Sequence, residues 1–166
     1  MSTMWDGTYT ALVTPFTADG AINNDLLCDL VDWQLQSGVD GIVPCGTTGE
    51  ASTITNDEHA SIIEAVVTRV NGQAKVLAGV GGNDTRNVTI LASRALEIGA
   101  DGVLAVAPYY NKPTQAGMVA HFTAIADTVD IPLVLYNVPG RTSSNILPAT
   151  VLRLAGHPNI VGIKEA

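Results

Sequence analysis

The stretch Gly99-Ala100-Asp101-Gly102-Val103-Leu104 decides the fold class, because it repeats the design of an earlier stretch, Gly38-Val39-Asp40-Gly41-Ile42-Val43. In both, a glycine follows a helical pattern, an Asp-Gly turn comes next, and an apolar run of strand type begins. Glycine suits the position after a helix because it adopts left-handed backbone angles at little cost. The repeat indicates a βα unit that recurs along the chain.

Apolar runs on both sides of these stretches extend the pattern. They predict strands at residues 10–16, 41–46, 75–81, 102–108, 132–138 and 159–166. The helices between them have recognisable start signals, which are Asn23 or Asn24, the capping-box pair Thr55 and Glu58, Thr114 and Pro148.

Each predicted helix also carries an apolar face expected to be buried. These faces comprise Leu26, Leu27, Leu30, Val31 and Trp33; Ile62, Ile63, Val66, Val67 and Val70; Val88, Leu91, Ala92, Ala95 and Leu96; Met118, Val119, Phe122 and Ile125; and Val151, Leu152 and Leu154.

Strands separated each time by one helix predict right-handed crossovers and a parallel sheet, either doubly wound or closed as a (β/α)8 barrel. The loop after the first strand, residues 16–21, lacks the glycine fingerprint of a dinucleotide-binding fold. The predicted fold class is therefore α/β, a (β/α)8 TIM barrel of which this chain supplies about the first six βα units.

Composition excludes several classes of function. With 166 residues, 46% of them hydrophobic, the chain can build one compact core. A net charge of −8 disfavours binding to nucleic acid or to an anionic membrane. No apolar run approaches the roughly 20 residues of a membrane span, and the start lacks the pattern of a signal peptide, so a cytoplasmic protein is expected. Cys28 and Cys45 lack metal-site spacing and are expected to be buried free thiols.

Lys164 interrupts the apolar run at residues 159–166. If that strand is buried on both faces, the environment favours the neutral amine, which is the nucleophile that forms a Schiff base with a ketone. The alternative is that Lys164 ends an edge strand and extends its ammonium into water.

In a barrel, functional groups gather at the carboxyl ends of the strands. The unusual residues predicted there are Thr47, Thr48, Tyr109, Tyr110, Tyr136, Arg141 and Lys164. Thr47-Thr48-Gly49 is interpreted as a carboxylate-binding loop near a helix start rather than an ordinary loop. The tyrosines are either packing residues or proton relays, and Arg141 is either a surface charge or a carboxylate clamp. His59, His121 and His157 fall in or after helices and are assigned no catalytic role.

Four motifs in order carry a resemblance to a known family. They are Gly46-Thr47-Thr48-Gly49-Glu50, Pro108-Tyr109-Tyr110-Asn111-Lys112-Pro113, Tyr136-Asn137-Val138-Pro139-Gly140-Arg141-Thr142 and Gly162-Ile163-Lys164-Glu165-Ala166. From about Thr10 to its end, the sequence resembles the dihydrodipicolinate synthase (4-hydroxy-tetrahydrodipicolinate synthase) family. That family belongs to the pyruvate-dependent class I aldolase superfamily, which also contains N-acetylneuraminate lyase.

The resemblance implies that Lys164 forms a Schiff base with pyruvate, whose carboxylate is held by Thr47 and Thr48, with Gly49 in the same binding loop. The enamine then attacks L-aspartate 4-semialdehyde, in lysine and diaminopimelate biosynthesis. Thr47, Tyr110 and Tyr136 would relay protons, with Tyr110 reaching in from a neighbouring subunit of a homodimer or homotetramer. No cofactor or metal is implied beyond the covalent pyruvate imine.

The resemblance also implies that Arg141 holds the semialdehyde carboxylate. Neuraminate lyases and related keto-acid aldolases of the superfamily typically lack arginine at this place. Arg141 therefore favours the synthase over those aldolases. Asn56 and Asn87 stand where some lysine-inhibited members have histidine and glutamate, so the resemblance leaves inhibition by lysine open.

The family's barrel has eight strands and a further helical region, whereas six strands are predicted here. Residues 1–166 are therefore expected to be the N-terminal part of a single barrel domain, with the last two strands absent. Unpaired first and sixth strands would expose Lys164 and favour self-association. An alternative of another class is a non-catalytic partner subunit in a mixed oligomer.

Overall fold

The computed structural model describes residues 5–166, which divide into two compact units. The first comprises residues 5–79 and 98–100, and the second comprises residues 80–97 and 101–166. Each unit contains parallel strands joined by helices, as the repeated βα pattern predicts.

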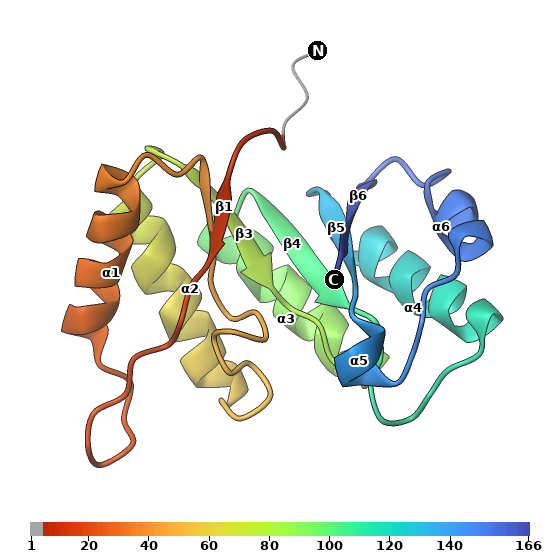
Figure 1. Cartoon of the computed structure of the whole chain (residues 1–166), viewed down its shortest axis with the longest axis horizontal. Helices are drawn as coiled ribbons and strands as arrows, with labels where there is room; N and C mark the ends of the chain where they lie inside the picture. Colours follow the sequence, from red (N-terminus) through yellow and green to blue (C-terminus); the bar gives the residue numbers. More distant parts are fainter. Residues whose placement is uncertain (1–4) are drawn as a thin grey trace. The chain divides into compact units, whose positions relative to one another are not determined.

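In the first unit the strands β1 (Tyr9–Ala11), β2 (Gly41–Val43) and β3 (Lys75–Gly79) lie in chain order and are all parallel. They alternate with α1 (Asn24–Gln36) and α2 (Asn56–Val70), which lie side by side in Figure 1. β1 ends earlier than predicted. The Leu12 amide still donates to the Val43 carbonyl at 3.0 Å, but Pro15 has no amide hydrogen for a strand that extends to residue 16, and Phe16 forms an isolated antiparallel bridge with Ile22.

In the second unit β4 (Gly102–Val106), β5 (Leu133–Asn137) and β6 (Ile160–Glu165) also follow chain order in parallel. Three helices accompany them, namely α3 (Thr85–Ile98), α4 (Gln115–Thr128) and α6 (Pro148–Leu154), and α4 packs against α6. A further short helix, α5 (Pro139–Thr142), follows β5 directly and was not predicted. Figure 1 shows it at the carboxyl end of β5.

The predicted helix starts are confirmed. The Asn23 side chain accepts a hydrogen bond from the amide of Leu26 at 3.0 Å. Thr55 and Glu58 form the reciprocal capping box, with the Glu58 amide 3.2 Å from the Thr55 hydroxyl and the Thr55 amide 2.7 Å from the Glu58 carboxylate. The Thr114 hydroxyl accepts from the Gly117 amide at 3.1 Å. These side chains satisfy amides that have no partner within the helix.

The predicted buried faces are largely confirmed, with Leu27, Ile62, Ile63, Met118 and Phe122 among the most buried side chains. Leu26, Trp33, Leu96 and Leu152 are exposed, so their predicted burial is wrong. At about 100° per residue, Leu26 and Trp33 lie too far around α1 from the buried pair Leu27 and Val31, and Leu152 lies nearly opposite Leu154 on α6. Leu96 lies in the last turn of α3.

The two glycines of the repeated stretch are confirmed at helix ends. Gly38 and Gly99 both adopt the left-handed region, with φ of +78° and +99°, which explains glycine at both places.

The prediction of two buried cysteines is correct for one of them. Cys45 is buried, and burial raises the pKa of its thiol to about 12. Cys28 is only half-buried, so its predicted burial is wrong, although both thiols are free as expected.

Within residues 5–166, no helix has the length and apolar character needed to cross a membrane.

Candidate active site

Lys164 and Tyr136 come together on neighbouring strands. They are register partners on β6 and β5, and the lysine Nζ lies 4.2 Å from the centroid of the tyrosine ring. The ring is 7% exposed and is therefore held firmly, whereas the Lys164 side chain is exposed. An ammonium over an aromatic face is attracted by the negative charge of that face. The structure thus places these two candidate site residues next to each other.

β6 is largely exposed, as expected for a sixth strand that is unpaired along one edge, and it is not buried on both faces. Of its residues only Ile160 is buried, while Val161 and Ile163 are 44% and 37% exposed. Within the described residues β6 pairs only with β5, so one edge of the strand meets no other backbone. The second interpretation of Lys164, as a residue of an edge strand with its amine in water, describes this structure.

Arg141 lies in α5, and its side chain is exposed at the carboxyl end of β5. Two buried hydroxyls hold this segment. The Thr142 hydroxyl donates to the carbonyl oxygens of Val138 at 3.1 Å and Ser144 at 2.8 Å, and the Ser144 hydroxyl donates to the Pro108 carbonyl at 2.8 Å. Because Pro108 follows β4, these bonds tie the end of β5 to the end of β4.

Tyr110 is not packed against Tyr136. Its backbone φ is +70°, a rare value for a bulky residue, and its side chain is 87% exposed. The next residue anchors the loop, because the Asn111 side-chain amide donates to the Asn83 carbonyl at 3.0 Å. Tyr110 therefore projects from a loop that is tied down beside it.

Thr47, Thr48 and Gly49 lie in the first unit, in a run of turns after β2. Gly49 is buried, and a Cβ there would lie only 3.0 Å from the Leu12 carbonyl oxygen, so the position suits glycine. Both threonine side chains are exposed. The nearest following helix, α2, begins at Asn56, where the capping box predicts it, so these three residues do not lie at a helix start. Any anion binding here must rest on the loop's own amides and hydroxyls.

Asn137 is a residue of the site that sequence reasoning missed. It is 2% exposed, and its side-chain oxygen accepts from the Ile146 amide at 2.9 Å. Its side-chain nitrogen donates to the Asn145 side-chain oxygen at 2.8 Å and to the Glu165 carboxylate at 2.9 Å. The signal was present, because an amide side chain inside the apolar run at residues 132–138 must find partners when buried.

The three histidines lie where the sequence predicts them, His59 in α2, His121 in α4 and His157 just after α6. Each one makes hydrogen bonds within the protein. His59 hydrogen-bonds through Nε2 with the Gly79 carbonyl at 2.7 Å, and His121 through Nδ1 with the Thr85 hydroxyl at 2.8 Å. Burial lowers the pKa of His121 to about 4, so its ring is neutral near pH 7. Within residues 5–166, no group of three or more His, Cys, Asp or Glu side chains is arranged to hold a metal ion.

Comparisons with known proteins extend this picture. The dihydrodipicolinate synthetase family matches residues 4–166. A 4-hydroxy-tetrahydrodipicolinate synthase from Pelobacter propionicus is 58% identical over 163 residues, covering 98% of this chain and 56% of that protein. The crystal structure of dihydrodipicolinate synthase from Aquifex aeolicus matches with a TM-score of 0.95 and 45% identity, over 98% of this chain and 55% of that one. A chloride-inhibited dihydrodipicolinate synthase from Acinetobacter baumannii, solved with pyruvate, matches with a TM-score of 0.95 and 47% identity, over 96% and 55%.

The chain therefore spans a little over half the length of the relatives it matches. The likeness to these structures and the succession of parallel βα units confirm the predicted fold class, the first six βα units of a (β/α)8 barrel.

Proposed function

Since the chain belongs to the dihydrodipicolinate synthetase family, we propose that the protein it represents is a 4-hydroxy-tetrahydrodipicolinate synthase. It condenses pyruvate with L-aspartate 4-semialdehyde in lysine and diaminopimelate biosynthesis. Residues 1–166 form the N-terminal part of its single barrel domain. The observation that carries the proposal is the pairing of Lys164 with Tyr136, which sets an amine beside a phenol.

Lys164 is the nucleophile. Its neutral amine attacks the ketone carbon of pyruvate, and loss of water leaves an imine between Nζ and that carbon. Loss of a proton from the methyl group gives the enamine, whose carbon attacks the aldehyde of the second substrate. These steps move protons onto and off oxygen and nitrogen, which is work for a phenol held next to the amine. The covalent imine takes the place of a separate cofactor.

The remaining site residues divide by substrate. Thr47 and Thr48, with Gly49 shaping their loop, bind the pyruvate carboxylate, supported by the exposed hydroxyls of the two threonines. Arg141 binds the carboxylate of the semialdehyde, supported by its exposed place at the end of β5. Tyr110 acts with Thr47 and Tyr136 in the proton relay and completes a neighbouring subunit's site, supported by its 87% exposure.

This division of roles requires a homo-oligomer, a dimer or a tetramer, since Tyr110 serves a second copy of the chain. The place of action is the cytoplasm, where a biosynthetic enzyme meets pyruvate.

Trapping with borohydride tests the proposal. The complete protein, incubated with pyruvate and then reduced, is expected to gain the mass of one reduced pyruvate adduct, and peptide mapping should place it on Lys164. Lys164→Ala is the matched control and should gain nothing. A folded wild-type protein that forms no adduct would overturn the proposal.

The exposure of Lys164 and β6 favours a second candidate for residues 1–166 alone, a non-catalytic partner subunit. The amine of Lys164 is open to solvent, and water would reach any enamine formed on it. Trapping on residues 1–166 expressed by themselves separates the two, because an adduct there would exclude a purely non-catalytic role.

A further inference from the structure

β6 carries a β-bulge near its start. Leu133 of β5 pairs with Ile160, but the next residue, Val134, pairs with Gly162. Val161 is therefore an extra residue without a partner on β5. A bulge of this kind shifts every later pairing of the strand by one residue.

That shift decides which side chain faces Tyr136. With the bulge, Tyr136 pairs with Lys164 and Asn137 pairs with Glu165. A strand without the bulge would bring Ile163 opposite Tyr136 and would turn Lys164 to the other face, because successive side chains alternate between faces. The bulged register is thus a condition for the lysine and the tyrosine to meet.

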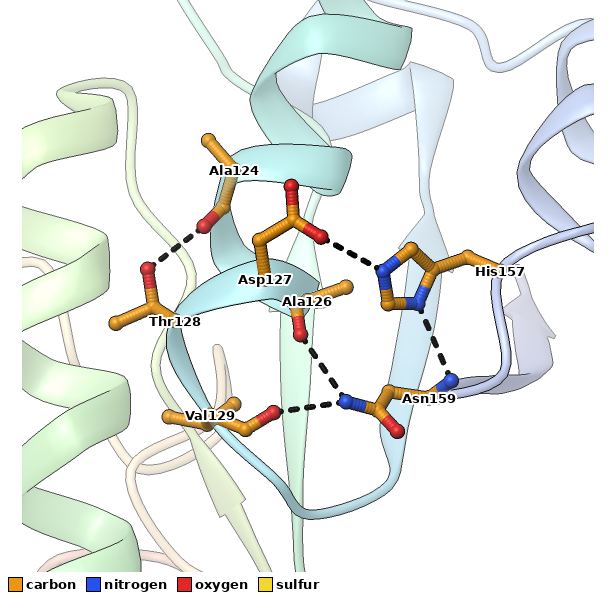
Figure 2. Close-up of polar contacts among 7 residues, drawn as sticks. All are labelled: Ala124, Ala126, Asp127, Thr128, Val129, His157 and Asn159. Carbon is orange, nitrogen blue, oxygen red and sulfur yellow. Dashed lines mark hydrogen bonds and ion pairs between the residues drawn. The ribbon is translucent and has the colours of Figure 1, made fainter.

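The start of β6 is held independently of this shift, as Figure 2 shows. The Asn159 side-chain amide donates to the carbonyl oxygens of Ala126 at 3.1 Å and Val129 at 2.9 Å. His157 donates through Nε2 to Asp127 at 3.0 Å and accepts through Nδ1 from the Asn159 amide at 3.2 Å. These contacts join the start of the strand to the end of α4, on the near side of the bulge. Because they precede the bulge, these contacts do not determine how the residues after Val161 pair with β5.

Beyond the bulge, Asn137 and Glu165 make the contact that discriminates between registers. The buried Asn137 nitrogen donates to both carboxylate oxygens of Glu165, at 2.9 and 3.1 Å. In the register without the bulge, Lys164 would stand opposite Asn137, and an ammonium has no lone pair to accept that hydrogen bond. A buried donor that loses its acceptor disfavours the slipped strand.

We propose that Glu165, through Asn137, is a positioning residue that holds β6 in the bulged register and so keeps Lys164 opposite Tyr136. The inference rests on the proposed function, because its consequence is the rate at which Lys164 forms the pyruvate imine. In this role Glu165 acts through Asn137 and Lys164 and takes no part in the chemical step. It acts from the opposite face of the same strand, one residue beyond the nucleophile.

Three substitutions of Glu165 in the complete protein distinguish the effect of its side-chain length from the effect of its charge. Glu165→Gln loses the charge but keeps a carbonyl oxygen at the same distance along the side chain. Glu165→Asp keeps the charge but is one methylene shorter, and Glu165→Ala has neither. The readout is the rate of borohydride-trapped adduct at limiting pyruvate, with the melting temperature as the check on folding.

Glu165→Asp and Glu165→Ala are expected to trap pyruvate about tenfold more slowly or worse, because misplacing a nucleophile by about 1 Å costs rate steeply. Glu165→Gln is expected to remain within about threefold of wild type. Equal rates in all three variants, or rates that follow charge so that aspartate is fast and glutamine slow, would overturn the inference. If Glu165→Ala fails to fold, the aspartate and glutamine variants still decide. If the wild-type protein forms no pyruvate adduct, the proposed function itself is contradicted. If the wild type forms the adduct and the Glu165 variants trap pyruvate at the same rate, only the role of Glu165 is contradicted.

Discussion

Tyr136 and Lys164 occupy paired positions on β5 and β6, with the lysine nitrogen 4.2 Å from the tyrosine ring centroid. The tyrosine is nearly buried and the lysine is exposed, so the fixed partner of the pair is the phenol. A nucleophile with a long, flexible stem gains orientation when it rests on a rigid aromatic face. In the proposed mechanism, Tyr136 therefore both positions the amine and supplies a group for proton transfer.

Tyr136→Phe separates those two contributions. Phenylalanine keeps the ring under the ammonium but removes the hydroxyl, so the fold and the position of Lys164 should be retained. The turnover number of the complete enzyme is expected to fall about 100-fold, the usual size of a lost general acid or base. Steady-state kinetics and a thermal melt check this. A wild-type turnover number in a properly folded variant would remove Tyr136 from the relay.

Arg141→Ala tests the assignment of the second substrate. Only the semialdehyde loses a partner if Arg141 binds its carboxylate, so imine trapping with pyruvate should stay near wild type while kcat/KM for the semialdehyde falls about 100-fold or more. Arg141→Lys keeps the charge without the two-pronged geometry and should recover only part of the loss. Equal damage to the trapping step and to the condensation would contradict the assignment.

Mixing two inactive variants tests whether Tyr110 serves a neighbouring subunit. A hybrid of Lys164→Ala with Tyr110→Phe contains one site in which a wild-type Lys164 meets a wild-type Tyr110 from the other copy. After subunit exchange, about a quarter of wild-type activity should return, since half of the dimers are hybrids with one working site each. Activity that stays at the sum of the separate variants would place Tyr110 within its own subunit's site.

His121 predicts a dependence of stability on pH. Burial lowers its pKa from 6.5 to about 4, so the unfolded chain binds a proton between these values and the folded chain does not. Protonation of His121 therefore does not reduce the free energy of unfolding above about pH 6.5. As the pH falls toward 4, the free energy of unfolding decreases by up to about 3 kcal/mol. His121→Asn is the control, because asparagine is polar but does not titrate.

The free energy of unfolding should be measured in urea at several pH values between 4 and 8. Wild type is expected to lose more stability than His121→Asn on acidification, whatever the absolute stability of the variant. Parallel pH profiles for the two proteins would show that His121 takes up its proton equally in the folded and unfolded states.

Residues 1–166 expressed alone are expected not to form a stable monomer. Within the described residues β1 pairs only with β2 and β6 only with β5, and Val161 and Ile163 of β6 expose 44% and 37% of their surface. Open parallel edges with apolar side chains favour pairing with another chain. Sedimentation at low micromolar concentration measures this, and a compact monomer with a cooperative melt would contradict the expectation.

The elements themselves were predictable from the sequence because their signals are local. Helix starts depend on side chains three residues from the amides they bind, as in Thr55 and Glu58. The two Gly-x-Asp-Gly stretches mark where helices end and strands begin. The chain order of the motifs also placed Lys164 and Tyr136 on successive strands, because parallel βα units bring consecutive strands together.

Burial and register, by contrast, were decided by the tertiary structure. Whether Lys164 is buried depends on what pairs with the edge of β6 that faces away from β5. The residues next to Lys164 in the sequence do not indicate which segment that is. The bulge at Val161 and the bond from Asn137 to Glu165 join residues on different strands, 28 positions apart in the second case. A one-residue shift of register exchanges the faces of a strand while leaving its sequence unchanged, so only the folded chain determines that Lys164 stands opposite Tyr136.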